Sequence, residues 1–125
     1  MSPESHDILE ILKFELKFLE EGGYARSPSS WRAPYIFEDS PSCVNFKRPI
    51  RTKSCAECPL MQFVPSRFRG DDVPCRFIRL NDNDQTVDSL YRTGTQAEME
   101  EALHIWLCRE IGRIEAERTQ VNRYL

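Results

Sequence analysis

The sequence predicts a small α+β protein that folds as a single domain over residues 1–125. Its length of 125 residues is that of one ordinary domain. Apolar residues recur with helical period near both ends of the chain, and a shorter stretch between them alternates apolar with charged residues. We therefore expect N- and C-terminal amphipathic helices that pack on a short β-hairpin, around an irregular centre that contains cysteines.

The first helix is expected over about 4–21. Ser2 or Ser5 can cap its start, and Gly22 and Gly23 supply a left-handed stop at its end. Apolar residues form two stripes on this helix, so that more than half of its circumference must be covered. Either the helix packs centrally within the domain, or one stripe meets a second copy of the chain and forms a homodimer.

The last helix is expected over about 96–119, because Thr95 and Glu98 match a capping box and no proline interrupts the run. Its apolar face consists of Met99, Leu103, Trp106, Leu107, Ile111 and Ile114. The hairpin is expected over about 75–92, where "CRFIRL" and "TVDSLYR" flank a linker rich in Asn and Asp. A loop with the cysteines fills about 22–75.

Four cysteines in this central region have a spacing that favours a metal site. They are Cys43, Cys55, Cys58 and Cys75. The two-residue gap between Cys55 and Cys58 lets one tight turn present two sulfurs to one ion, and four thiolates complete a tetrahedral zinc site. Zinc would add folding free energy on the order of 10 kcal/mol to a segment with little regular structure. In outline the pattern resembles the loose class of small zinc-binding modules.

Other interpretations of the cysteines stay open. Four thiolates also suit an iron–sulfur cluster, and the Cys-Pro of "CAECPL" is similar to the ending of bacterial ferredoxin motifs. Cys55 and Cys58 could form a redox dithiol, although no βαβ pattern surrounds them. All four could also be reduced cysteines without a ligand. The fifth, Cys108, shares a helix face with His104, and this pair could chelate a metal or merely edge a helix interface.

The charge is distributed unevenly along the chain. The net charge is −3, but residues 43–80 carry eight basic and three acidic residues, a balance of +5, and the rest carries −8. The candidate anion or partner surface consists of Lys47, Arg48, Arg51, Lys53, Arg67 and Arg69. Clustered Lys and Arg suit phosphates, whereas the overall acidity makes a protein partner equally plausible as nucleic acid.

Several classes of protein are disfavoured by what the sequence lacks. No apolar run approaches the roughly 18–20 residues that span a bilayer, and the N-terminus does not resemble a secretory signal, so we expect a cytoplasmic protein with no membrane partner. No phosphate-binding glycine loop, nucleophile elbow or two-histidine metalloprotease helix is present, which makes an enzyme the less favoured class.

The leading functional hypothesis is a small cytoplasmic protein that carries a structural four-cysteine zinc and acts as a protein- or nucleic-acid-binding module. One alternative is an iron–sulfur protein that serves in redox chemistry or electron transfer. The other is a metal-free structural protein that associates with itself through the first helix.

Overall fold

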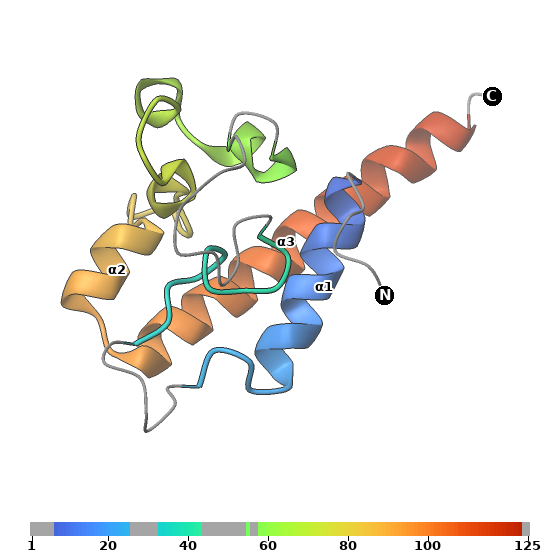
Figure 1. Cartoon of the computed structure of the whole chain (residues 1–125). Helices are drawn as coiled ribbons and strands as arrows, with labels where there is room; N and C mark the ends of the chain where they lie inside the picture. The colour runs from blue at the N-terminus through green and yellow to red at the C-terminus, as the bar shows by residue number, and fades with distance from the viewer. Residues whose placement is uncertain (1–6, 26–32, 44–54, 56–57, 124–125) are drawn as a thin grey trace.

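A computed structural model describes residues 7–25, 33–43, 55 and 58–123 (Figure 1). This part of the chain is mostly helical and contains no β-strand. The α-helices are α1 (Ile8–Glu20), α2 (Val87–Thr93) and α3 (Gln96–Arg123), and the short 3-10 helices are η2 (Pro59–Phe63), η3 (Ser66–Phe68) and η4 (Pro74–Phe77). The prediction of an α+β fold is therefore wrong. None of the helices described is both long and apolar enough to cross a membrane.

Helix α1 begins at Asp7, whose carboxylate accepts a hydrogen bond from the backbone N–H of Leu9 at 3.4 Å. The expected caps, Ser2 and Ser5, lie outside the described residues. The predicted homodimer through α1 stays a prediction, although its own chain buries much of both stripes. Leu9, Ile11, Leu12 and Leu19 are buried, and Leu16 and Phe18 are partly buried.

The end of α1 is the glycine stop that the sequence predicts. Gly22 has a φ of +81°, in the left-handed region. Its N–H donates to the carbonyl of Leu19 at 3.0 Å, and the N–H of Gly23 donates to the carbonyl of Phe18 at 2.8 Å. These two bonds form a Schellman motif, which satisfies carbonyls that the helix leaves without an internal partner.

Helix α3 confirms the predicted capping box. The N–H of Glu98 donates to the hydroxyl of Thr95 at 3.1 Å, and the N–H of Thr95 donates to the Glu98 carboxylate at 2.8 Å. The helix packs along α1 and also contacts α2 (Figure 1). Its predicted apolar face is buried along its whole length, at Met99, Leu103, Trp106, Leu107, Ile111 and Ile114.

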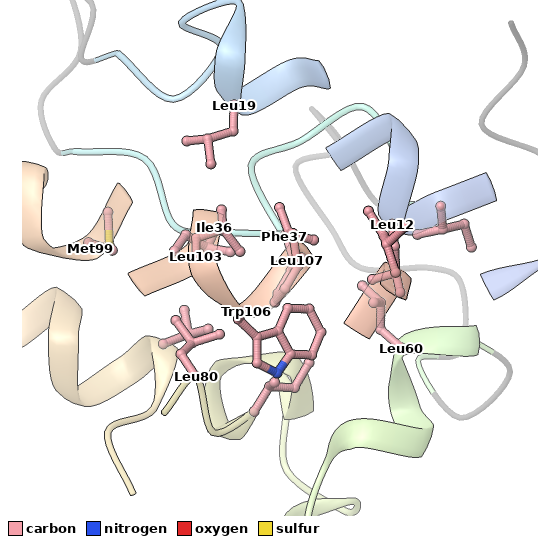
Figure 2. Close-up of a cluster of buried hydrophobic side chains, with 14 of the residues drawn as sticks. Leu12, Leu19, Ile36, Phe37, Leu60, Leu80, Met99, Leu103, Trp106 and Leu107 are labelled. Atoms are coloured by element: carbon pink, nitrogen blue, oxygen red, sulfur yellow. The ribbon is translucent and has the colours of Figure 1, made fainter. Parts of the chain in front are cut away.

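The ring of Trp106 lies at the centre of the hydrophobic core (Figure 2). It meets the ring of Phe37 edge to face at a centroid distance of 5.9 Å and the ring of Phe63 at 5.0 Å. Phe37 belongs to the loop after α1, and Phe63 ends η2. The irregular middle of the chain is thus anchored on α3 through aromatic contacts, which add a specific geometry to the burial of apolar area.

The predicted hairpin over 75–92 is not formed. One isolated antiparallel bridge pairs Arg79 with Thr86, and α2 follows directly. Thr86 and Ser89 form a capping box, with the Ser89 N–H on the Thr86 hydroxyl at 3.0 Å and the Thr86 N–H on the Ser89 hydroxyl at 2.8 Å. Val87 and Leu90 lie on one face of this helix and are buried. Their burial and the capping box stabilise the segment as a helix.

We expect alanine substitutions at two glycines to have opposite effects on stability. Neither position has a neighbouring atom within 4 Å of an added Cβ, so only backbone conformation differs. Gly22→Ala should lower the unfolding free energy by about 1 kcal/mol, because the left-handed conformation disfavours a side chain. Gly112→Ala, inside α3, should raise it by about 0.5–1 kcal/mol. Urea unfolding measures both, and a loss at Gly112 or a gain at Gly22 would contradict this account.

Candidate functional site

Cys55 and Cys58 lie on a tight turn. The N–H of Cys58 donates to the carbonyl of Cys55 at 3.1 Å. Cys58 is also the N-cap residue of η2, and its carbonyl accepts from the N–H of Met61 at 2.9 Å. Pro59 occupies the first position of this helix, where no N–H is needed. The hydrogen bond between Cys55 and Cys58 is that of a tight turn, which can aim two sulfurs at one point.

Cys75 and Cys43 come from two other segments. Cys75 lies in η4, which packs against η2, and both Cys58 and Cys75 rest against the edge of the hydrophobic core. Cys43 ends the described loop after Ser40, and its N–H donates to the Ser40 carbonyl at 3.0 Å. All four cysteines are partly buried and none is in a disulfide.

The other three cysteines lie close enough to Cys75 to influence its thiol electrostatically. Burial raises the pKa of the Cys75 thiol well above its ordinary value. Negative charge on Glu38, and then on Cys43, Cys58 and Cys55, raises this pKa further. Three distant parts of the sequence thus bring cysteines into the neighbourhood of the Cys75 thiol.

The expectation of a formed metal cluster needs correction. Within the described residues, no three His, Cys, Asp or Glu side chains form a group arranged to hold a metal ion. The assignment of zinc or of an iron–sulfur cluster to Cys43, Cys55, Cys58 and Cys75 stays a prediction.

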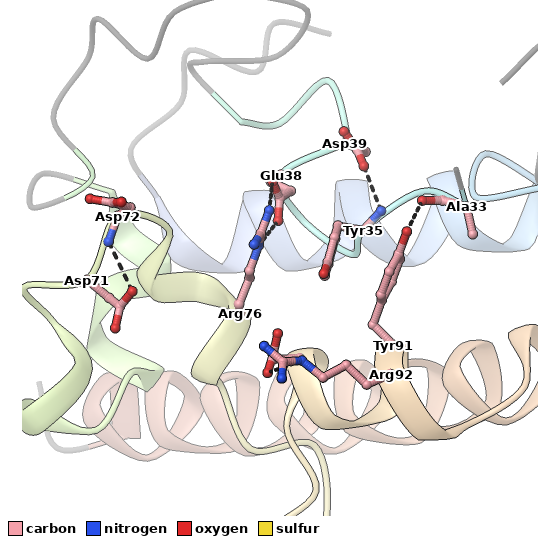
Figure 3. A network of polar contacts seen from close by, with 10 residues as sticks. Ala33, Tyr35, Glu38, Asp39, Asp71, Asp72, Arg76, Tyr91 and Arg92 are labelled. Atoms are coloured by element: carbon pink, nitrogen blue, oxygen red, sulfur yellow. Dashed lines mark hydrogen bonds and ion pairs between the residues drawn. The ribbon is translucent and has the colours of Figure 1, made fainter. Parts of the chain in front are cut away.

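An ion pair next to Cys75 fixes η4 against the loop after α1. The guanidinium of Arg76 donates two hydrogen bonds to the carboxylate of Glu38, whose side chain is only 8% exposed (Figure 3). These hydrogen bonds raise the pKa of Arg76. The guanidinium also lies 4.1 Å from the ring centroid of Tyr35, which in turn stacks on Tyr91 at 3.6 Å. The sequence placed Arg76 in a basic stretch but contained no sign of these partners.

A second buried acid, Glu15, holds the same loop to α1. This side chain is fully buried, and its two carboxylate oxygens accept from the hydroxyl of Ser42 at 2.7 Å and of Tyr24 at 2.9 Å. Burial raises the pKa of Glu15 to about 7, and the hydrogen bonds from Ser42 and Tyr24 oppose that rise. The sequence did contain a signal for this residue, because Glu15 lies three residues after Leu12 on the apolar side of the helix.

The expected basic surface is described only in part. Lys47, Arg48, Arg51 and Lys53 lie outside the described residues. Arg67 and Arg69 are exposed. The guanidinium of Arg67 lies 4.8 Å from the ring centroid of Phe68, which stacks on Phe77 at 4.3 Å. Arg69 donates from Nε to the carbonyl of Val64 at 2.9 Å, so part of its hydrogen-bonding capacity serves the fold.

His104 and Cys108 both lie on exposed positions of α3. The Nε2 atom of His104 lies 3.5 Å from the carboxylate of Glu20 at the end of α1. This contact joins the two helices when His104 is protonated. Within the described part of the chain, no group of three or more possible ligands forms around this pair, so a metal site on His104 and Cys108 gains no support.

Comparison with models of known protein families, with curated proteins and with solved structures found no match for this chain.

Glu15 predicts a specific dependence of stability on pH. Its pKa is about 7 in the folded protein and close to the ordinary 4.5 when unfolded, so the folded state holds the proton more tightly. The stabilisation by the neutral acid is complete below about pH 4.5 and is lost as the pH rises through about 7, a change of about 3 kcal/mol. Glu15→Gln should remove this dependence.

Urea unfolding of the wild type and of Glu15→Gln at a series of pH values checks the sign. The variant should gain stability relative to the wild type between pH 5 and pH 8. Glu10→Gln, on the exposed side of the same helix, controls for the loss of one carboxylate. A difference between wild type and Glu15→Gln that does not change with pH would show that Glu15 is not held in a low-dielectric environment.

Proposed function

We propose that this chain is a small cytoplasmic binding module whose irregular middle is stabilised by zinc on Cys43, Cys55, Cys58 and Cys75. The observation that carries this proposal is the tight turn of Cys55 and Cys58 at the start of η2, which packs against η4, the helix that contains Cys75. A tight turn supplies two of the sulfurs, and two separate segments supply one each. This is the donor set of a closed structural zinc site, in which no position is left open for chemistry.

The architecture supplies a physical reason for such a site. The middle of the chain contains the short 3-10 helices η2, η3 and η4, which have poorer hydrogen-bond geometry than α-helices. A metal that joins η2, η4 and the loop after α1 would stabilise three segments that share few other regular interactions. The high pKa of Cys75 means that zinc must displace a proton there, so binding would weaken as the pH falls.

The binding role is proposed for the basic residues of the same stretch of sequence, toward an anionic partner. Arg67 is exposed and lies over the Phe68–Phe77 stack. A guanidinium beside an aromatic face can meet phosphates, carboxylates or bases. Lys47, Arg48, Arg51, Lys53 and Arg69 are the other members of the proposed surface.

Elemental analysis and the visible spectrum of protein purified without air test the metal. We expect about one zinc per chain, lost in Cys75→Ser together with much of the stability, and retained in Cys108→Ser, which alters an exposed cysteine outside the group. Iron with sulfide and a visible absorption band would instead support the iron–sulfur alternative. A folded wild type without metal, and with the mass of a dimer in solution, would favour the self-associating alternative.

Charge reversal tests the partner surface. The double variant Arg67→Glu, Arg69→Glu should weaken binding to a fluorescent oligonucleotide, and the dependence on salt should fall by about one unit of slope for each phosphate that the variant no longer neutralises. Arg109→Glu, which alters an exposed arginine on α3, is the matched control. If neither nucleic acid nor an acidic polyglutamate probe binds even at low salt, the basic residues do not form the proposed surface.

A further inference from the structure

A carboxyl group on α1, that of Glu15, is bonded to both ends of the loop segment that carries Cys43, directly at Ser42 and through Tyr24 at Phe37. Both carboxylate oxygens of Glu15 are used, one by Tyr24 and the other by Ser42. Each bond leads to a different end of the segment 37–43. The position of Cys43 at the end of this segment is therefore set from the middle of α1, where Leu12 and Leu19 anchor the helix in the core.

The Tyr24 branch holds the first end of the segment. The hydroxyl of Tyr24 donates to Glu15 and accepts from the backbone N–H of Phe37 at 2.9 Å. Phe37 has a φ of +70°, an uncommon conformation for an aromatic residue, and its ring is buried against Trp106. A backbone held in this way needs several simultaneous contacts to persist, and the tyrosine hydroxyl is one of them.

The Ser42 branch holds the other end, directly before the cysteine. The hydroxyl of Ser42 donates to Glu15 and also lies 3.2 Å from the hydroxyl of Ser40. The carbonyl of Ser40 accepts the N–H of Cys43. Two serines and the carboxyl group thus form a closed polar cluster, from which the Cys43 side chain extends.

Packing of the helix alone does not explain why position 15 carries a carboxyl group. At a fully buried helix position an apolar side chain of similar volume would pack without the desolvation that a carboxyl group carries. A carboxyl group offers two oxygens that can bind two hydroxyls, whereas an apolar residue would leave Ser42 and Tyr24 without this acceptor. The residue type therefore matches the task of joining two points of one loop.

We propose that Glu15 is a positioning residue for Cys43, which it holds in the four-cysteine group through Ser42 and Tyr24. What Cys43 binds in that group rests on the function proposed above. The position of Cys43 itself does not, so the thiol can be followed in metal-free protein. Glutamine keeps an acceptor and a donor at this site, whereas methionine fills a similar volume with neither.

The test compares Glu15→Gln with Glu15→Met by the alkylation of individual cysteines in metal-free protein, resolved by mass spectrometry. The exposed Cys108 is the internal reference for intrinsic rate. We expect Cys43 to react roughly tenfold faster in Glu15→Met than in the wild type, because a loop that has lost a buried hydrogen-bond acceptor opens more often. Glu15→Gln should stay near the wild-type rate, and zinc affinity by chelator competition should follow the same order.

Further variants keep the test decisive. Ser42→Ala removes only the bond next to Cys43 and should also accelerate its alkylation, and it decides the matter if circular dichroism shows Glu15→Met to be unfolded. Leu90→Ala, in the buried face of α2, controls for a general loss of stability and should leave the ratio of Cys43 to Cys108 unchanged.

Equal Cys43 rates in the wild type and in folded Glu15→Met, or in Ser42→Ala, would overturn the inference. A wild-type chain that takes up no zinc would instead overturn the proposed function, and the alkylation rates would still decide whether Glu15 positions Cys43.

Discussion

The apolar face of α3 is the surface on which the rest of the described chain depends. Helices α1 and α2 pack against it, and the rings of Phe37 and Phe63 reach it through Trp106. In a domain with no sheet among its described residues, the core must come from helices, and α3 is the longest of them. The loop after α1 and η2 each place one aromatic ring against this face.

Irregular segments leave backbone N–H and C=O groups without hydrogen bonds from regular secondary structure. Here side chains form hydrogen bonds with several of these groups. The hydroxyl of Tyr24 accepts from the N–H of Phe37, Arg69 donates to the carbonyl of Val64, and Tyr91 donates to the carbonyl of Ala33. Two of these bonds join residues that are far apart in sequence. The conformation of the middle of the chain therefore depends on individual polar side chains. A single substitution there should disturb one loop, whereas a substitution in a helix should disturb the whole core.

The contrast between the helices and the middle explains how much of the fold could be predicted. The glycine stop of α1, the capping box of α3 and the buried face of α3 all depend on residues within one or two turns of each other, so the sequence contains them. The prediction of a hairpin was wrong because a short apolar pattern does not distinguish a strand from a helix. Thr86 is a residue type favoured at the start of a helix, but Ser89 occupies the position where a capping box ordinarily has Glu or Gln, so the sequence signal for α2 was weak.

The candidate site likewise contains local features, which the sequence predicts, and contacts between distant residues, which it does not. The turn from Cys55 to Cys58 follows from its spacing and from Pro59, which are local features. The placement of Cys43 and Cys75 could not be predicted, because it depends on two contacts between distant residues. Ser42 is held by Glu15 across 27 positions of sequence, and Arg76 is held by Glu38 across 38.

These two supports are chemically alike, since each uses a buried carboxylate to fix the residue next to a cysteine. Glu38 accepts hydrogen bonds from a charged donor, whereas Glu15 accepts them only from hydroxyls. Burial raises the pKa of Glu15 to about 7. The residues next to Cys43 and Cys75 are thus held by independent contacts, Ser42 to α1 and Arg76 to the loop after α1. A cation that binds all four sulfurs would join these two supports to the turn of Cys55 and Cys58, and would tie the irregular middle to the helical core at three points.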